Sequence, residues 1–89
     1  MELQSVFLLA AKVGALEGYL FERKEVEPLT NWIDNIRQRH HNLSPGVRKE
    51  LAPVLAPVLE RALEYGKETL SPALKEKLEQ IFQESSADL

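Results

Sequence analysis

The chain contains no cysteine. Disulfide bonds, thiolate nucleophiles, iron–sulfur clusters and cysteine-ligated zinc are therefore excluded. Glycine-rich phosphate loops are absent as well, because the four glycines form neither the G-x-G-x-x-G nor the P-loop pattern. We expect no cofactor of these kinds.

Histidine is scarce, and the two residues present, His40 and His41, are adjacent. Neighbouring residues of a helix point about 100° apart, so only one of them can serve a given site. Residues 36–38, which lie three and four positions before them, include no metal ligand, and no Glu-x-x-His pair occurs. The sequence predicts no metal site and no catalytic residues, and His40 is interpreted as a histidine at the edge of the core.

A secretory signal and a membrane span are not indicated by the sequence. Met1 to Gln4 lack the basic start of a secretory signal, and charged residues interrupt the longest apolar stretch at positions 12, 17 and 22. We therefore expect a cytoplasmic protein with no membrane partner.

What the chain does have is enough apolar side chain for one core. Its 89 residues are 44% hydrophobic and 28% charged, which is typical of a single small globular domain. We expect this domain to span residues 1–84 and residues 85–89 to form a frayed C-terminal tail. A core of this size supplies little net stability, so a partner or a second copy is a reasonable expectation.

Helical periodicity dominates the sequence, and no segment alternates in the way a half-buried strand requires. We predict an all-α fold, a compact bundle of four helices at approximately 3–23, 28–40, 45–65 and 72–83. Two starts are well marked, because Ser44-Pro45 and Ser71-Pro72 each combine a capping serine with a proline in the first helical position. Trp32 falls in register with apolar neighbours and is expected to be mostly buried.

The predicted third helix contains two prolines, Pro53 and Pro57. Both fall on the polar side of the helix, so we expect one helix bent at these prolines, with both facing water. A break near Ala52 is the alternative. The apolar stripe that continues through both prolines comprises Val47, Leu51, Val54, Leu55, Val58, Leu59, Ala62 and Leu63.

The predicted first helix is apolar over most of its circumference. Its main stripe is Leu3, Val6, Ala10, Val13, Leu20 and Phe21, with Leu9 and Leu16 on one flank. A second patch, which we interpret as a candidate interface, comprises Leu8, Ala11, Ala15, Gly18 and Tyr19. Gly14 and Gly18 each cost about 1 kcal/mol of helix propensity relative to alanine, a cost that suits the close approach of another backbone.

Charge is uneven along the chain, whose net value is −3. Residues 35–49 contain four basic residues, both histidines and no acid. The candidate anion-binding patch in this stretch comprises Arg37, Arg39, His41, Arg48 and Lys49. A solvated turn is the alternative interpretation, because exposed cations are common on small domains.

These patterns favour a non-enzymatic helical protein–protein interaction module, such as an adaptor, a chaperone-like factor or a regulatory subunit. We expect it to form a homodimer through the first helix, because excess apolar surface marks interfaces more often than active sites. One alternative is nucleic-acid or anion binding through the basic turn 35–49. Another is an enzyme whose site cannot be read from the sequence.

Overall fold

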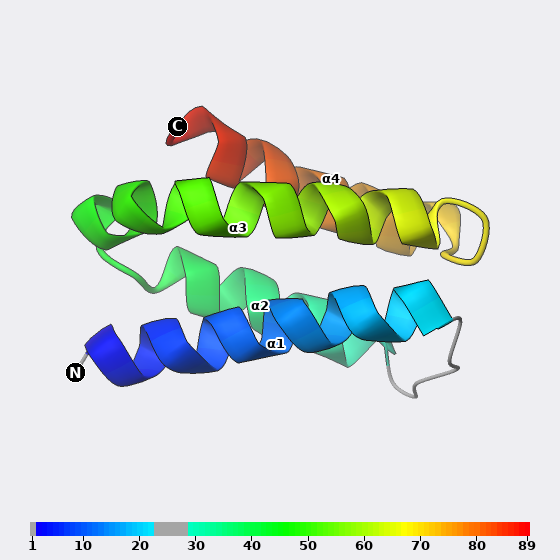
Figure 1. The fold of residues 1–89 in the computed structure, drawn as a ribbon, viewed down its shortest axis with the longest axis horizontal. Coiled ribbons are helices and arrows are strands. Elements are labelled where there is room, and N and C mark those ends of the chain that lie inside the picture. The colour runs from blue at the N-terminus through cyan, green and yellow to red at the C-terminus, as the bar shows by residue number, and fades with distance from the viewer. Residues whose placement is uncertain (1, 23–28) are drawn as a thin grey trace.

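The computed structural model describes residues 2–22 and 29–89, and all regular structure in these residues is helical. The helices are α1 (Glu2–Glu22), α2 (Leu29–His41), α3 (Pro45–Gly66) and α4 (Pro72–Ala87). Figure 1 shows α1 and α3 side by side and running in the same direction, with α2 and α4 behind them running the opposite way. The predicted all-α four-helix bundle is confirmed.

Two helices begin at the predicted serine–proline pairs. Ser44 Oγ accepts a hydrogen bond from the Val47 N–H at 3.5 Å, and Ser71 Oγ accepts one from the Leu74 N–H at 3.3 Å. The proline after each serine occupies the first turn, where its missing N–H leaves no helical bond unmade. Local sequence alone therefore sets both starts.

Helix α3 runs without interruption through Pro53 and Pro57, and both prolines are exposed. A proline has no N–H to donate to the carbonyl four residues earlier in the helix. The carbonyls of Lys49 and Pro53 therefore receive no backbone hydrogen bond within the helix. This loss falls on the exposed side of the helix, where water can satisfy the carbonyls. The predicted continuity is confirmed, and the alternative break near Ala52 is wrong.

One residue of the predicted α3 stripe is misplaced. Val54 is 60% exposed, whereas Ala52 and Ala56, which the prediction omitted, are buried beside Leu55 and Leu59. The buried side of α3 is therefore centred closer to the two alanines than the sequence predicts. Small side chains at these positions let neighbouring helices approach closely. This is a tertiary effect, and it cannot be predicted from the hydrophobicity of the sequence.

Helix α4 ends later than predicted, since it continues to Ala87 rather than ending at residue 83. Ser85, which the sequence places in a frayed tail, is fully buried, and the Asp88 N–H donates to the Ser85 carbonyl at 3.2 Å. Ser85 continues the row of buried residues that includes Leu78 and Ile81. This packing stabilises the last turn of α4. It could not be predicted from the sequence, because a serine does not indicate a buried position.

The core lies between the four helices and receives side chains from each. The largest fully buried aliphatic side chains within it are Leu9 and Leu16 of α1, Ile33 and Ile36 of α2, Leu59 of α3, and Leu78 and Ile81 of α4. The main contacts of α1 are with α2 and α3, and those of α4 are with the same two helices. Helix α1 thus has two neighbours, and the rest of its circumference lies at the surface.

Candidate functional site

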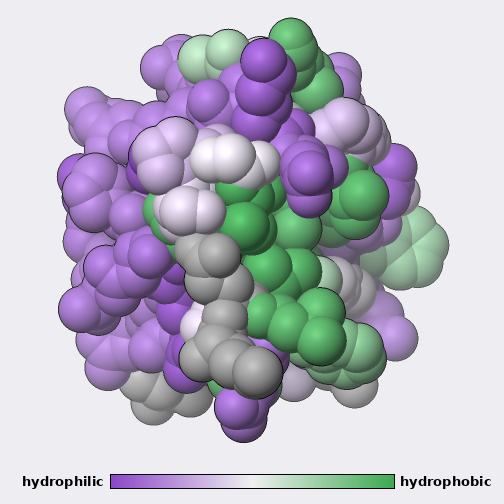
Figure 2. All heavy atoms as spheres, turned by 90° about the vertical axis from the view of Figure 1, so that its left-hand side faces the viewer, coloured by the Kyte–Doolittle hydropathy of each residue, from purple (hydrophilic) through white to green (hydrophobic). Residues whose placement is uncertain are grey.

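The exposed side of α1 is almost entirely apolar. Among the α1 residues whose exposure is described, Gln4 and Glu22 are the exposed polar ones. The others form what we call the outer face of α1: Leu3, Phe7, Leu8, Ala10, Ala11, Gly14, Gly18 and Phe21. Figure 2 shows apolar residues gathered on one side of the end that carries the N-terminus of α1, while the opposite side is hydrophilic. Contiguous exposed apolar surface of this kind marks interaction sites.

Two rows of residues on different sides of α1 explain which side is buried. The buried row, at spacings of four, three and four, is Leu9, Val13, Leu16 and Leu20. The outer row, at spacings of four, three, four and three, is Phe7, Ala11, Gly14, Gly18 and Phe21. Every member of the buried row is a large aliphatic residue, so burying it removes more apolar area from water than burying the outer row would.

The predicted main stripe of α1 is therefore wrong for three of its six residues, while the other three are buried or partly buried. Leu3 is 77% exposed, Phe21 is 65% exposed and Ala10 is exposed, although all three were assigned to the stripe. Leu9 and Leu16, which were assigned to its flank, lie at the centre of the buried side. Because α1 is apolar around most of its circumference, periodicity could not choose between its sides, and packing against α2 and α3 decides.

The two charged residues in the middle of α1 are held away from the outer face. Lys12 Nζ lies over the Trp32 ring on the α2 side, 4.4 Å from the ring centroid. Glu17 accepts a hydrogen bond from Arg61 Nε of α3 at 3.0 Å, and this bond raises the pKa of Arg61 above its ordinary value. Neither charge interrupts the outer face between the first and last turns of α1.

The structure divides the predicted interface patch between two environments. Tyr19 packs edge-on against Trp32 of α2 with ring centroids 5.8 Å apart, and Trp32 Nε1 donates to the Lys12 carbonyl at 3.1 Å. Ala15 is half-buried, whereas Leu8, Ala11 and Gly18 lie on the outer face. The aromatic residues that α1 exposes are instead Phe7 and Phe21.

Sequence reasoning missed Phe7, which is 76% exposed. The available signal was the four–three spacing of the outer row, which is the spacing of a coiled-coil seam. It was hidden because the residues between the two phenylalanines are small and contribute little to a hydrophobic stripe.

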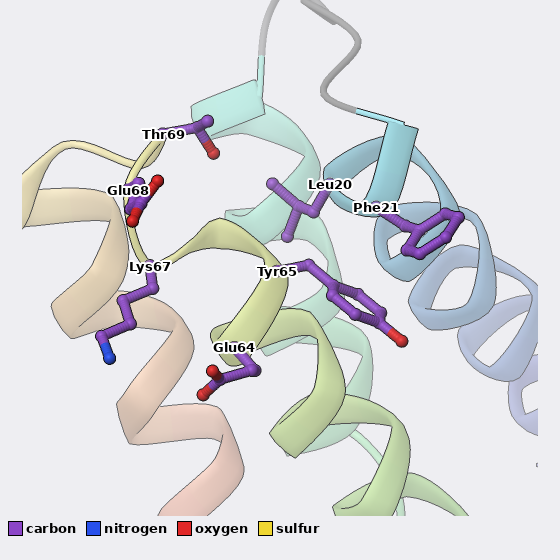
Figure 3. Close-up of a pocket in the computed structure, with 7 residues that line it drawn as sticks. All are labelled: Leu20, Phe21, Glu64, Tyr65, Lys67, Glu68 and Thr69. Carbon is purple, nitrogen blue, oxygen red and sulfur yellow. The ribbon is translucent and has the colours of Figure 1, made fainter.

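Phe21 is held in place by α3. Its ring lies edge-on to Tyr65 with centroids 5.0 Å apart. Figure 3 shows these two rings together between α1 and α3, with Leu20 beside them and Lys67 pointing to the far side of α3. A depression of ≈ 470 Å³ adjoins this pair. The contact with Tyr65 orders one end of the outer row without covering it.

The predicted anion-binding residues do not converge on one place. Arg37 and His41 line a depression that also contains the carboxylates of Asp34 and Glu84. Arg39 lines a different depression, and its Nε donates to Asn35 Oδ1 at 2.8 Å. Arg48 is half-buried and Lys49 is exposed. The mixed charge gives this turn no clear preference for an anion, and the anion-binding hypothesis stays a prediction.

Two polar side chains, one on α2 and one on α4, are buried in the bundle. His40 and Ser85 are both buried, and neither His40 ring nitrogen nor Ser85 Oγ has a hydrogen-bond partner among the described residues. His40 Nδ1 is 3.8 Å from Glu84 Oε2. Burial lowers the pKa of the His40 imidazole below its ordinary value of 6.5, and the Glu84 carboxylate opposes this shift only in part.

No group of three histidine, aspartate or glutamate side chains in residues 2–22 and 29–89 is placed to hold a metal ion. Within the same residues, Leu3–Glu22 is the one helix long and apolar enough to cross a membrane. A buried core helix and a signal sequence also meet this criterion, and 22% of this stretch is buried in the fold.

Comparisons with known proteins assign no family to the chain. No protein-family model, no curated protein and no solved structure matches it.

Proposed function

We propose that this protein is a non-enzymatic helical interaction module that self-associates, with two copies packing through the outer face of α1. The observation that carries the proposal is the exposure of four large apolar side chains on one helix: Leu3, Phe7, Leu8 and Phe21. Both charges in the middle of that helix are engaged on its flanks. A surface without charge at its centre and with aromatic residues near its ends has the composition of an interface core.

The area of the outer face fits a second copy of the chain. With 76% of Phe7 and 65% of Phe21 exposed, and leucines beside them, the face offers on the order of 500 Å² of apolar side chain. Two copies covering each other bury about 1,000 Å², close to the lower limit for specific association. We therefore expect a reversible dimer with a dissociation constant in the micromolar range.

A lipid surface fits the outer face less well. Interfacial helices carry lysine and arginine beside the apolar side, and anionic headgroups attract them. The polar residues exposed on the described part of α1 are Gln4 and Glu22, and the whole chain has a net charge of −3. Small residues in the middle of the face permit close helix packing but add little area for insertion into lipid.

Sedimentation velocity across a concentration series tests the proposal, with Phe7→Gln as the main variant. Each dimer then loses two buried phenyl rings, so the dissociation constant should rise at least about 100-fold. Val54→Gln is the matched control, because Val54 is 60% exposed on α3 and lies outside the outer face. It should leave association unchanged, and both variants should keep the helical circular dichroism of the parent.

Equal association of the parent and Phe7→Gln would overturn the proposal. A monomeric parent that co-sediments with phosphatidylcholine–phosphatidylserine vesicles would also overturn it, and would identify the outer face as a lipid-binding surface.

A further inference from the structure

The outer row of α1 has a phenylalanine at each end and three small residues between them. It is Phe7, Ala11, Gly14, Gly18 and Phe21, and Gly14 lies seven residues from each phenylalanine. We infer that two copies of α1 cross antiparallel about a twofold axis at Gly14, so that Phe7 of each protomer packs on the partner's Phe21. This inference rests on the proposed self-association and specifies its geometry.

The size pattern fits the way crossing helices diverge. Seven residues of helix span about 10 Å, and at crossing angles of about 20–40° two axes move sideways by about 4–7 Å over that distance. Small residues allow contact at the crossing point, and large ones are needed to fill the wider gap on either side. Phe7 and Phe21 are exposed and occupy these outer positions.

The packing of a single protomer does not account for the two central glycines. A Cβ atom added to Gly14 or Gly18 would meet nothing within 4 Å. Glycine destabilises a helix relative to alanine, so these positions lower helix stability without relieving any crowding inside the protomer. The close approach of another helix to the outer row supplies the missing reason.

Charge favours the antiparallel arrangement over the parallel one. A parallel pair would bring the two Glu22 carboxylates together and align the two helix dipoles. An antiparallel pair places Glu22 near the first turns of the partner's α1, where the dipole is positive. It also opposes Ala11 to the partner's Gly18, which keeps small residues together next to the axis.

Disulfide trapping tests this geometry cleanly, because the chain has no cysteine of its own. Ala11→Cys and Gly18→Cys are made as separate single variants, both at exposed positions. After mild oxidation of an equimolar mixture, intact mass spectrometry should show mainly the mixed disulfide. Ala11→Cys alone should crosslink poorly, because its two copies are offset by about 9 Å along the axes, beyond the usual Cα–Cα limit of about 7 Å. Val54→Cys serves as the control outside the outer face and should not crosslink.

A second measurement uses a site outside the outer row and so avoids perturbing the contact. A nitroxide attached to Gln4→Cys, at an exposed position near the start of α1, should give a label-to-label separation of about 30 Å in the antiparallel dimer. A parallel dimer would place the two labels next to each other.

The outcomes separate this inference from the proposed function. A dimer that crosslinks through Ala11→Cys alone, or that shows the short nitroxide distance, overturns the antiparallel crossing and leaves self-association standing. A dimer that yields neither the mixed disulfide nor the 30 Å separation also overturns the crossing. A protein that stays monomeric and yields no crosslink overturns both.

Discussion

The burial of His40 ties a single side chain to the stability of the whole bundle. It lies in α2 with 2% of its surface exposed. The charged groups around it are Glu84 and Asp88 from α4 and its end, Arg48 from α3, and His41 from α2. Loss of solvent outweighs the attraction of the two carboxylates, so the pKa of His40 is lowered from its ordinary value of 6.5.

This shift predicts a loss of stability in weak acid. Below pH 6.5 the unfolded chain binds a proton at His40 more readily than the folded chain does, so the free energy of unfolding falls. The contribution is complete above pH 6.5 and decreases as the pH falls from 6.5 toward the lowered pKa, by at most about 1.4 kcal/mol per pH unit. Urea unfolding between about pH 5.5 and 7.5 measures this slope before most carboxylates titrate.

His40→Leu should remove most of that slope, because leucine fills similar space and the ring nitrogens make no hydrogen bond among the described residues. A non-titrating exposed position provides the control, since Val54→Gln should keep the slope of the parent. If the free energy of unfolding of the parent protein is constant across this pH range, the predicted effect of His40 burial is wrong.

At the scale of elements, α1 combines a side that stabilises the fold with a side that does not. The buried row supplies Leu9, Val13, Leu16 and Leu20 to the core. The outer row holds two glycines with open space around them. Fold stability and association are therefore separable on this helix.

Gly14→Gln should shift the two properties in opposite directions. Glutamine is a better helix former than glycine and meets open space, so the free energy of unfolding should rise by about 0.5–1 kcal/mol under conditions where the protein is monomeric. The same side chain obstructs the helix crossing, so dimerisation should weaken. Thermal melts at low concentration and sedimentation at high concentration read the two effects separately.

Gly46→Gln is the comparison variant, because Gly46 also has open space but lies in the first turn of α3. It should leave association unchanged. If Gly14→Gln dimerises as well as the parent, the outer row is not the contact.

The sequence predicted the elements better than their orientation. Serine caps and prolines act locally, so the starts of α3 and α4 were predicted to the residue. The end of α4 was not, because Ser85 is buried by tertiary contact rather than by its own hydrophobicity. The predicted interface patch and the outer face both lie on α1, but the patch includes Tyr19 rather than Phe7, because the contact of Tyr19 with Trp32 involves a different helix.

At the scale of the whole molecule, the bundle covers one side of α1, and the covered side is the one whose burial removes more apolar area from water. Placing Leu9 and Leu16 against α2 and α3 leaves Phe7 and Phe21 outside. Hydrophobic periodicity alone does not show which side of α1 is buried, because both sides of the helix are apolar. The surplus apolar surface is thus a property of the assembled fold.

The central claim is that a second copy covers the outer face of α1, and the most direct test is the mass of the unmodified protein in solution. Sedimentation equilibrium from about 1 to 500 µM should show a reversible rise from the protomer mass of 10.1 kDa toward about 20 kDa, with no larger species. A protein that remains at 10.1 kDa up to the highest concentration would contradict the account.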